Sequence, residues 1–139
     1  MSYICDYFSI EELVPEYTLK AMFKAGADPW LLFDDRVLWT ADELRKRYGT
    51  AFINDWPFGG YHHHRGYRPF DCKDGAEYSQ HKFGRAFDVT FYNVKADEIR
   101  DDIRNTPSMR VFQYIRRVED NVGWLHYDIA NSLGMVRFF

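Results

Sequence analysis

The chain has little cysteine and no long apolar run. Its 139 residues include two cysteines, Cys5 and Cys72, which lie far apart in the sequence. A chain of this length buries enough apolar surface to fold without cross-links, so we expect free thiols in a reducing compartment. No apolar segment approaches the ~20 residues that cross a bilayer, which argues against a transmembrane helix and a membrane partner.

An excess of positive charge is also missing. The sequence has 18 basic and 21 acidic residues, a formal net charge of −3, and no basic stripe, which argues against a nucleic-acid partner. The N-terminal segment lacks both a basic region and the apolar region of a signal peptide. We therefore expect cytoplasmic synthesis without a signal peptide.

Apolar and aromatic residues are abundant. They make up 46% and 19% of the chain, too much for a disordered segment. The length is that of one ordinary domain, so we expect residues 1–139 to form a single domain.

Three segments carry helix signals. Ser9-Ile-Glu-Glu12 is a capping box, which predicts a helical start that Pro15 breaks or restarts. A second box at Thr40-Ala-Asp-Glu43, with Gly49 as a stop, predicts a helix over 40–48. Apolar residues at helical spacing predict an amphipathic helix over 95–105.

The segments outside these helices carry the predicted strands. We expect a short strand over 51–54, an alternating strand over 85–91, and a hairpin with arms 111–119 and 124–129 around a turn at 120–123. The segment 56–84 is a long loop, and loops of this length in a compact domain are usually functional. The fold class is therefore α+β, a small antiparallel sheet with flanking helices.

Two of these strands carry metal-ligand types on their polar face. Asp88 opposes the apolar side of the first strand, and His126 and Asp128 oppose that of the second. His81 lies seven residues before Asp88, and Gly84 lets the chain turn back. Two imidazoles and a carboxylate can hold a catalytic zinc. The alternative is that these residues are hydrogen-bonded structural residues.

A further histidine run, His62-His63-His64, lies inside the long loop. Consecutive residues of an extended segment point to opposite sides, so at most two of the three can face one ion. We expect loop residues at the rim of the site, with one of them near the substrate.

Three motifs resemble those of a known family. Ser79-Gln-His-Lys-Phe-Gly-Arg-Ala-Phe-Asp88 fits the Ser-x-His-x-x-Gly-x-Ala-x-Asp signature of the zinc peptidases that include D-Ala-D-Ala carboxypeptidases and dipeptidases and phage L-alanyl-D-glutamate endolysins. Trp124-Leu-His126 resembles their second signature, and Arg65-Gly-Tyr-Arg-Pro69 is similar to their Ser-Gly-Tyr-Arg segment. The resemblance covers residues 9–130.

The resemblance implies a fold and a set of roles. The fold would be that of these peptidases and the hedgehog signalling domain. One zinc ion (Zn2+) per chain would be bound by His81, Asp88 and His126. Arg68 matches the arginine that stabilises the substrate or the oxyanion. Ser79 matches the serine beside the first ligand, and we expect it to contact the substrate.

One position departs from the family pattern. The dipeptidases carry their catalytic glutamate three residues before the last histidine, where this chain has Gly123. The general base must come from elsewhere, and Glu119, just before the hairpin turn, is the first choice. Asp128 is the alternative, either as the base or as a residue that orients a zinc ligand.

The expected function is that of a zinc-dependent peptidase. Its substrate would be an amide bond in a peptidoglycan stem peptide, cut as a carboxypeptidase or endopeptidase of phage or bacterial origin. It would reach the cell wall after release or as a virion component. The rival reading is a non-catalytic metal-binding protein of the same fold, structural or associated with other virion proteins. A third reading is that the matching residues are coincidental.

Overall fold

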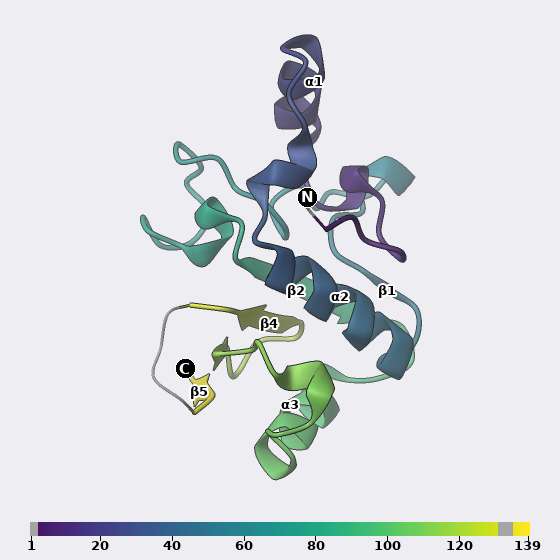
Figure 1. Ribbon diagram of the computed structural model, residues 1–139, viewed down its shortest axis with the longest axis vertical. Coiled ribbons are helices and arrows are strands. Elements are labelled where there is room, and N and C mark those ends of the chain that lie inside the picture. Colours follow the sequence, from purple (N-terminus) through teal and green to yellow (C-terminus); the bar gives the residue numbers. More distant parts are fainter. Residues whose placement is uncertain (1–2, 131–134) are drawn as a thin grey trace.

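Five short strands form one sheet in the order β1-β2-β4-β3-β5 (Figure 1). The structure is a computed structural model that describes residues 3–130 and 135–139. The strands are β1 (Ala51–Phe52), β2 (Ala86–Phe91), β3 (Arg117–Val118), β4 (Leu125–Asp128) and β5 (Arg137–Phe138). The α+β class is as predicted.

The sheet is mixed, whereas the sequence predicted an antiparallel one. Strands β1, β2, β4 and β3 pair antiparallel, but β5 pairs with β3 in parallel. The predicted strands ended with the hairpin, so β5 was not predicted. It lies along the edge of β3 that does not pair with β4, and it runs in the same direction as β3. Its two residues carry too weak a pattern to predict.

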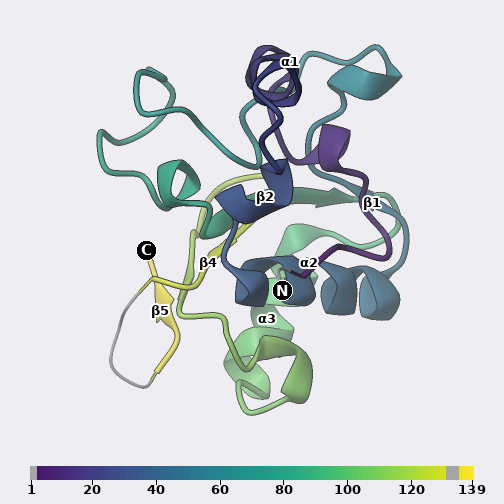
Figure 2. The ribbon, with the colours of Figure 1, turned by 45° about the horizontal axis from the view of Figure 1, so that its top comes forward.

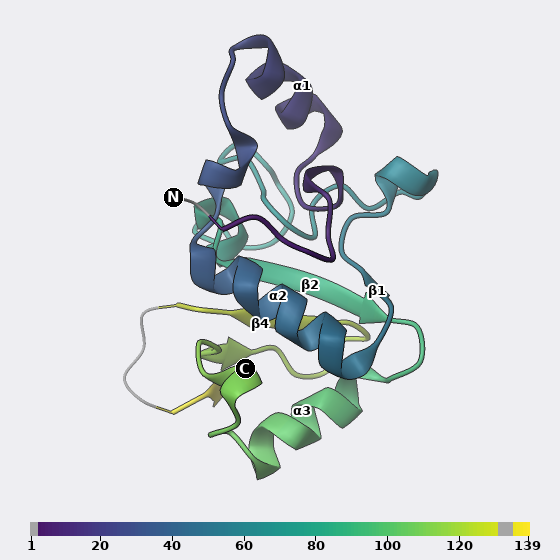
Figure 3. The ribbon, with the colours of Figure 1, turned by 45° about the vertical axis from the view of Figure 1, so that its right-hand side comes forward.

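The described residues form three α-helices, α1 (Glu16–Lys24), α2 (Asp35–Tyr48) and α3 (Ala96–Asn105), of which α2 and α3 pack against the sheet. Helix α2 crosses one face of the sheet, with α1 and α3 at opposite ends of the molecule (Figure 3). The long connection between β1 and β2 passes on both sides of α1 (Figure 2). Within the described ranges, no helix combines the length and apolar character that a membrane span needs.

The two faces of β2 and β4 differ as predicted. Phe87, Val89, Leu125 and Tyr127 are buried in the apolar core. The Tyr127 hydroxyl donates to the carbonyl of Val37 at 2.8 Å, which joins β4 to α2. The opposite face carries the polar side chains described below.

The predicted start of α2 is wrong. The helix begins at Asp35, and the side chain of Asp34 accepts a hydrogen bond from the Arg36 amide. Thr40 lies inside the helix, where its hydroxyl donates to the Arg36 carbonyl at 2.7 Å. A threonine hydroxyl can bond either an amide at a helix start or a carbonyl one turn back, so the box alone did not fix the boundary.

The other capping box is confirmed, and the first hairpin arm is mostly wrong. Ser9 and Glu12 cap a short 3-10 helix, and α1 restarts after Pro15. Only Arg117–Val118 of the predicted arm 111–119 is strand, whereas Arg110–Phe112 is a 3-10 helix. The apolar residues of that segment recur at the i, i+3, i+4, i+7 spacing of a helical face, which the strand interpretation overlooked.

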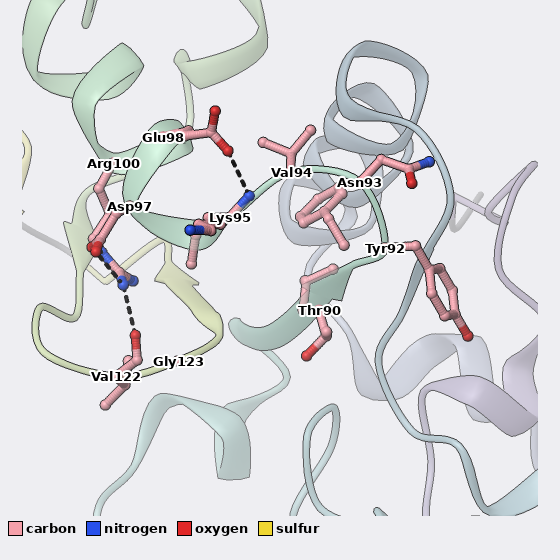
Figure 4. A pocket seen from close by; sticks show the side chains of 13 residues that line it. Thr90, Tyr92, Asn93, Val94, Lys95, Asp97, Glu98, Arg100, Val122 and Gly123 are labelled. Carbon is pink, nitrogen blue, oxygen red and sulfur yellow. Dashed lines mark hydrogen bonds and ion pairs between the residues drawn. The ribbon is translucent and has the colours of Figure 1, made fainter.

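A buried arginine holds the hairpin turn. Arg100 of α3 is 2% exposed, and its guanidinium donates to the carbonyls of Glu119, Val122 and Trp124 at 2.6 to 3.2 Å. Figure 4 shows it reaching Asp97 and Val122 beside a cavity of about 510 Å³. The Asp97 carboxylate and the three carbonyls together compensate the buried charge of Arg100. Because all three carbonyls lie in or beside the turn between β3 and β4, these hydrogen bonds fix the turn.

We predict that Arg100→Ala lowers the free energy of unfolding by about 3 kcal/mol, because the substitution leaves three carbonyls unpaired and opens a cavity. Urea denaturation followed by circular dichroism measures the change. Arg104→Ala is the control on the same helix, since Arg104 is half exposed and pairs with Asp120 at the surface. It should cost no more than about 1 kcal/mol. Equal losses in the two variants would contradict the role of Arg100.

Candidate metal centre

Three side chains from separate elements converge on the polar face of the sheet. His81 lies in the 3-10 helix Gln80–Phe83, Asp88 in β2 and His126 in β4. Asp88 is paired with His126 in the β2–β4 register, so their side chains share a face. One ligand atom from each of the three lies within 4.8 Å of the others. The group is a candidate metal-binding site, as the spacing predicted.

Asp88 is the centre of the group. Its Oδ1 lies 2.8 Å from Nδ1 of His126 and 3.3 Å from Nε2 of His81. All three side chains are buried: Asp88 is 5% exposed, His126 is 7% exposed and His81 is 1% exposed. Burial alone would raise the pKa of Asp88, but the facing His126 ring outweighs the effect of burial and holds that pKa below its ordinary value.

The local chain geometry that brings His81 back to Asp88 depends on Gly84. Its φ of 65° is in the left-handed region, and a Cβ there would overlap the carbonyl oxygen of Leu32. Ser79 caps the preceding turn, because its hydroxyl accepts a hydrogen bond from the His81 amide at 3.3 Å. The turn and the glycine together direct the His81 ring inward.

His81 is set up as a neutral ligand. Its Nδ1 donates to the carbonyl of Gly66 at 2.8 Å, which leaves the lone pair on Nε2. That Nε2 is buried and makes no hydrogen bond with any described residue. Burial lowers the pKa of His81 and favours the uncharged ring. A buried nitrogen lone pair beside a carboxylate is what a bound cation would satisfy.

His126 lies between two carboxylates. Its Nδ1 faces Asp88 at 2.8 Å and its Nε2 faces Asp128 at 3.0 Å. A neutral imidazole can donate to only one of them. Burial opposes a charge on the ring, yet Asp128 and Asp88 raise the pKa of His126 to about 9. Both carboxylates are satisfied if the ring carries a second proton, or if Nε2 donates to Asp128 and a cation binds between Nδ1 and Asp88.

Asp128 is a partner of His126 rather than a group facing open space. It is fully buried, and its carboxylate also accepts three hydrogen bonds from Arg117 at 2.8 to 3.1 Å and one from the amide of Ala130. Of the two roles left open by the sequence, the geometry favours orienting the ligand.

Arg68 contacts the group directly, whereas Glu119 lies on the chain segment that pairs with His126. Arg68 donates to Oδ2 of Asp88 at 3.3 Å. Glu119 is half buried, and its amide donates to the His126 carbonyl at 3.2 Å. Continuing the β3–β4 register by one residue puts Glu119 opposite His126, with both side chains on the same face.

Sequence reasoning missed two basic residues at the site. Arg117 pairs with Asp128, and the buried Arg65 donates to the Thr90 hydroxyl at 2.8 Å while its carbonyl accepts from the Asp88 amide. Alternation along the strand identified Asp128 as a residue of the polar face. The same alternation places Arg117 on that face, but only once the pairing of β3 with β4 is known. Arg65 carries no such signal, because its segment has no regular secondary structure.

The three consecutive histidines point to different neighbours, as expected for a loop. His62 lies against the ring of Phe52, and His63 stacks on Trp56. His64 contacts Asp74 and Tyr17. Together with Arg65 and Arg68 they line an open cavity of about 500 Å³.

Comparisons with known proteins do not identify the chain. No family model matches it, and neither curated proteins nor solved structures include a match.

The first prediction for this site concerns its metal content. His81→Ala should bind one equivalent of divalent metal fewer than the unmodified protein, because it removes one of the three ligands. Elemental analysis after dialysis measures the difference. His63→Ala is the control, since His63 stacks on Trp56 away from the group. Unchanged metal content in His81→Ala would contradict the site.

The second prediction concerns Asp128. In metal-free Asp128→Asn, the pKa of His126 should fall below about 9, because the variant loses the carboxylate that stabilises the imidazolium. The ring would then lose its proton at lower pH than in the unmodified protein. Zinc affinity should fall by about 10- to 100-fold. NMR titration of His126 and competition with a zinc chelator measure the two effects.

Asp101→Asn is the matched control, because that exposed carboxylate pairs with Arg104 on α3 and belongs to neither group of metal-ligand types. A His126 titration curve that is the same in Asp128→Asn and in the unmodified protein would exclude the orienting role.

Proposed function

We propose that this protein is a zinc-dependent peptidase that hydrolyses an amide bond in peptidoglycan stem peptides. The observation that carries the proposal is the convergence of His81, Asp88 and His126, with a buried Nε2 on His81 that makes no hydrogen bond to any described residue. The motif resemblance over 9–130 supports the substrate class, and both carboxypeptidase and endopeptidase activity are compatible with it.

The donor set fits zinc. Two imidazole nitrogens and one carboxylate oxygen are the ligand types of catalytic zinc sites, which keep a further position for water or substrate. A zinc ion at such a site activates water near neutral pH and polarises the carbonyl under attack. Asp128 would hold the His126 ring so that Nδ1 faces the ion.

Glu119 is the proposed general base. It lies opposite His126 on the site face, its side chain is half exposed, and it is not part of the Asp128–Arg117 pair. It would take a proton from the attacking water and return it to the leaving amine.

Arg68 is the proposed anion-stabilising group. Its guanidinium contacts Asp88 and also borders the open cavity of about 500 Å³. From this position it would bind a peptide carboxylate or the developing oxyanion. Ser79 would contact the substrate beside His81, in addition to capping the turn.

The partner would be the peptide portion of a phage or bacterial cell-wall target, reached after release from the cell or as part of a virion. Neither a nucleic acid nor a membrane is part of the proposal.

A second candidate is a non-catalytic metal-binding protein of this fold, structural or associated with virion proteins. Two observations favour it: all three ligand residues are less than 9% exposed, and Gly123 stands where the dipeptidases carry a glutamate. Metal would then stabilise the fold without turnover.

Incubation with isolated peptidoglycan separates the two candidates. The peptidase should release fragments whose masses name the bond that is cut, and Glu119→Gln should reduce release at least about 100-fold while zinc stays bound. Asp120→Asn is the control, because Asp120 pairs with Arg104 at the surface. Zinc binding without any fragment release would favour the non-catalytic candidate, and full activity of Glu119→Gln would exclude Glu119 as the base.

A further inference from the structure

A second group of metal-ligand types lies in the connection between β1 and β2. His64, Cys72 and Asp74 each offer a ligand atom, and these atoms lie within 4.8 Å of one another. His64 and Cys72 are half buried and Asp74 is exposed. The group shares no residue with the first one and includes a thiol, which the first group lacks.

The imidazole of His64 is oriented from both sides. Its Nδ1 lies 2.6 Å from Oδ2 of Asp74, and its Nε2 lies 3.3 Å from the hydroxyl of Tyr17 in α1. A contact on one ring nitrogen fixes the ring and leaves the other for a ligand. The nitrogen that faces Asp74 is therefore positioned to share a cation with that carboxylate.

Cys72 is brought to the same place by a turn. Its amide donates to the carbonyl of Pro69 at 3.0 Å, and the thiol forms no disulfide within the described part of the chain. Thiolate, imidazole and carboxylate together select a borderline ion such as zinc or cobalt over calcium or magnesium, which prefer oxygen ligands.

We propose that His64, Cys72 and Asp74 form a second site for a zinc-type divalent cation, distinct from the group around Asp88. This site goes beyond the proposed peptidase activity and does not depend on it. The ion would link three residues of an irregular loop, the first and last of which lie ten residues apart in the sequence.

The loop in question presents Arg68 to the first site. The Nε of Arg68 donates to the carbonyl of His64 at 2.6 Å, and its Nη1 contacts the carbonyl of Asp74 at 3.4 Å. Its Nη2 donates to Asp88. A cation bound by His64 and Asp74 would fix the two carbonyls that hold this arginine, so the second site would position Arg68.

Cobalt titration tests the site without any activity measurement. With cobalt chloride under reducing conditions, the unmodified protein should develop the near-ultraviolet charge-transfer band of a thiolate bound to cobalt. Cys72→Ser should lose this band and one equivalent of bound metal. Cys5→Ser is the matched control, because the Cys5 thiol lies against the Leu38 carbonyl, and it should keep the band.

Two further variants keep the test decisive. His81→Ala should keep the band, which separates this site from the peptidase proposal. Asp74→Asn, an exposed and conservative change, should weaken cobalt binding at the thiolate by more than about 10-fold. Absence of the band in the unmodified protein, or its survival in Cys72→Ser, would overturn the second site.

Discussion

A buried negative charge on Asp88 is the constraint on which the site depends. The carboxylate lies on a central strand, contacts the rings of His81 and His126, and accepts a hydrogen bond from Arg68. A charge in this position is costly unless cations or strong donors surround it. The capped turn before β2, the left-handed glycine at 84, and the β2–β4 register all serve to bring those partners to one carboxylate.

The sequence predicted most of this arrangement because the informative signals are local. Alternation along β2 and β4 separates an apolar face from a polar one, and it placed Asp88 and His126 correctly. The pattern around Gly84 required a chain reversal that a left-handed residue allows. Helix α3 and the Ser9 capping box were likewise found from nearby residues.

What the sequence could not predict depends on long-range contacts. Strand β5 pairs with β3 over two residues, and no local pattern sets its direction. Arg100 lies on a predicted amphipathic helix, but its buried guanidinium donates to three carbonyls of a turn that is distant in the sequence. The ion pair between Arg117 and Asp128 follows from the pairing of β3 with β4. The predicted first arm of the hairpin was too long to give this register. Likewise, only the folded loop brings Cys72 to His64.

A crystal structure of the zinc-loaded protein with anomalous data at the zinc edge would show directly whether the group around Asp88 binds metal. We expect an anomalous peak bonded to Nε2 of His81, a carboxylate oxygen of Asp88 and Nδ1 of His126, at about 2.0 to 2.2 Å from each. A map with no peak among these three atoms, with Asp88 contacting only the protonated His126 ring, would contradict this expectation.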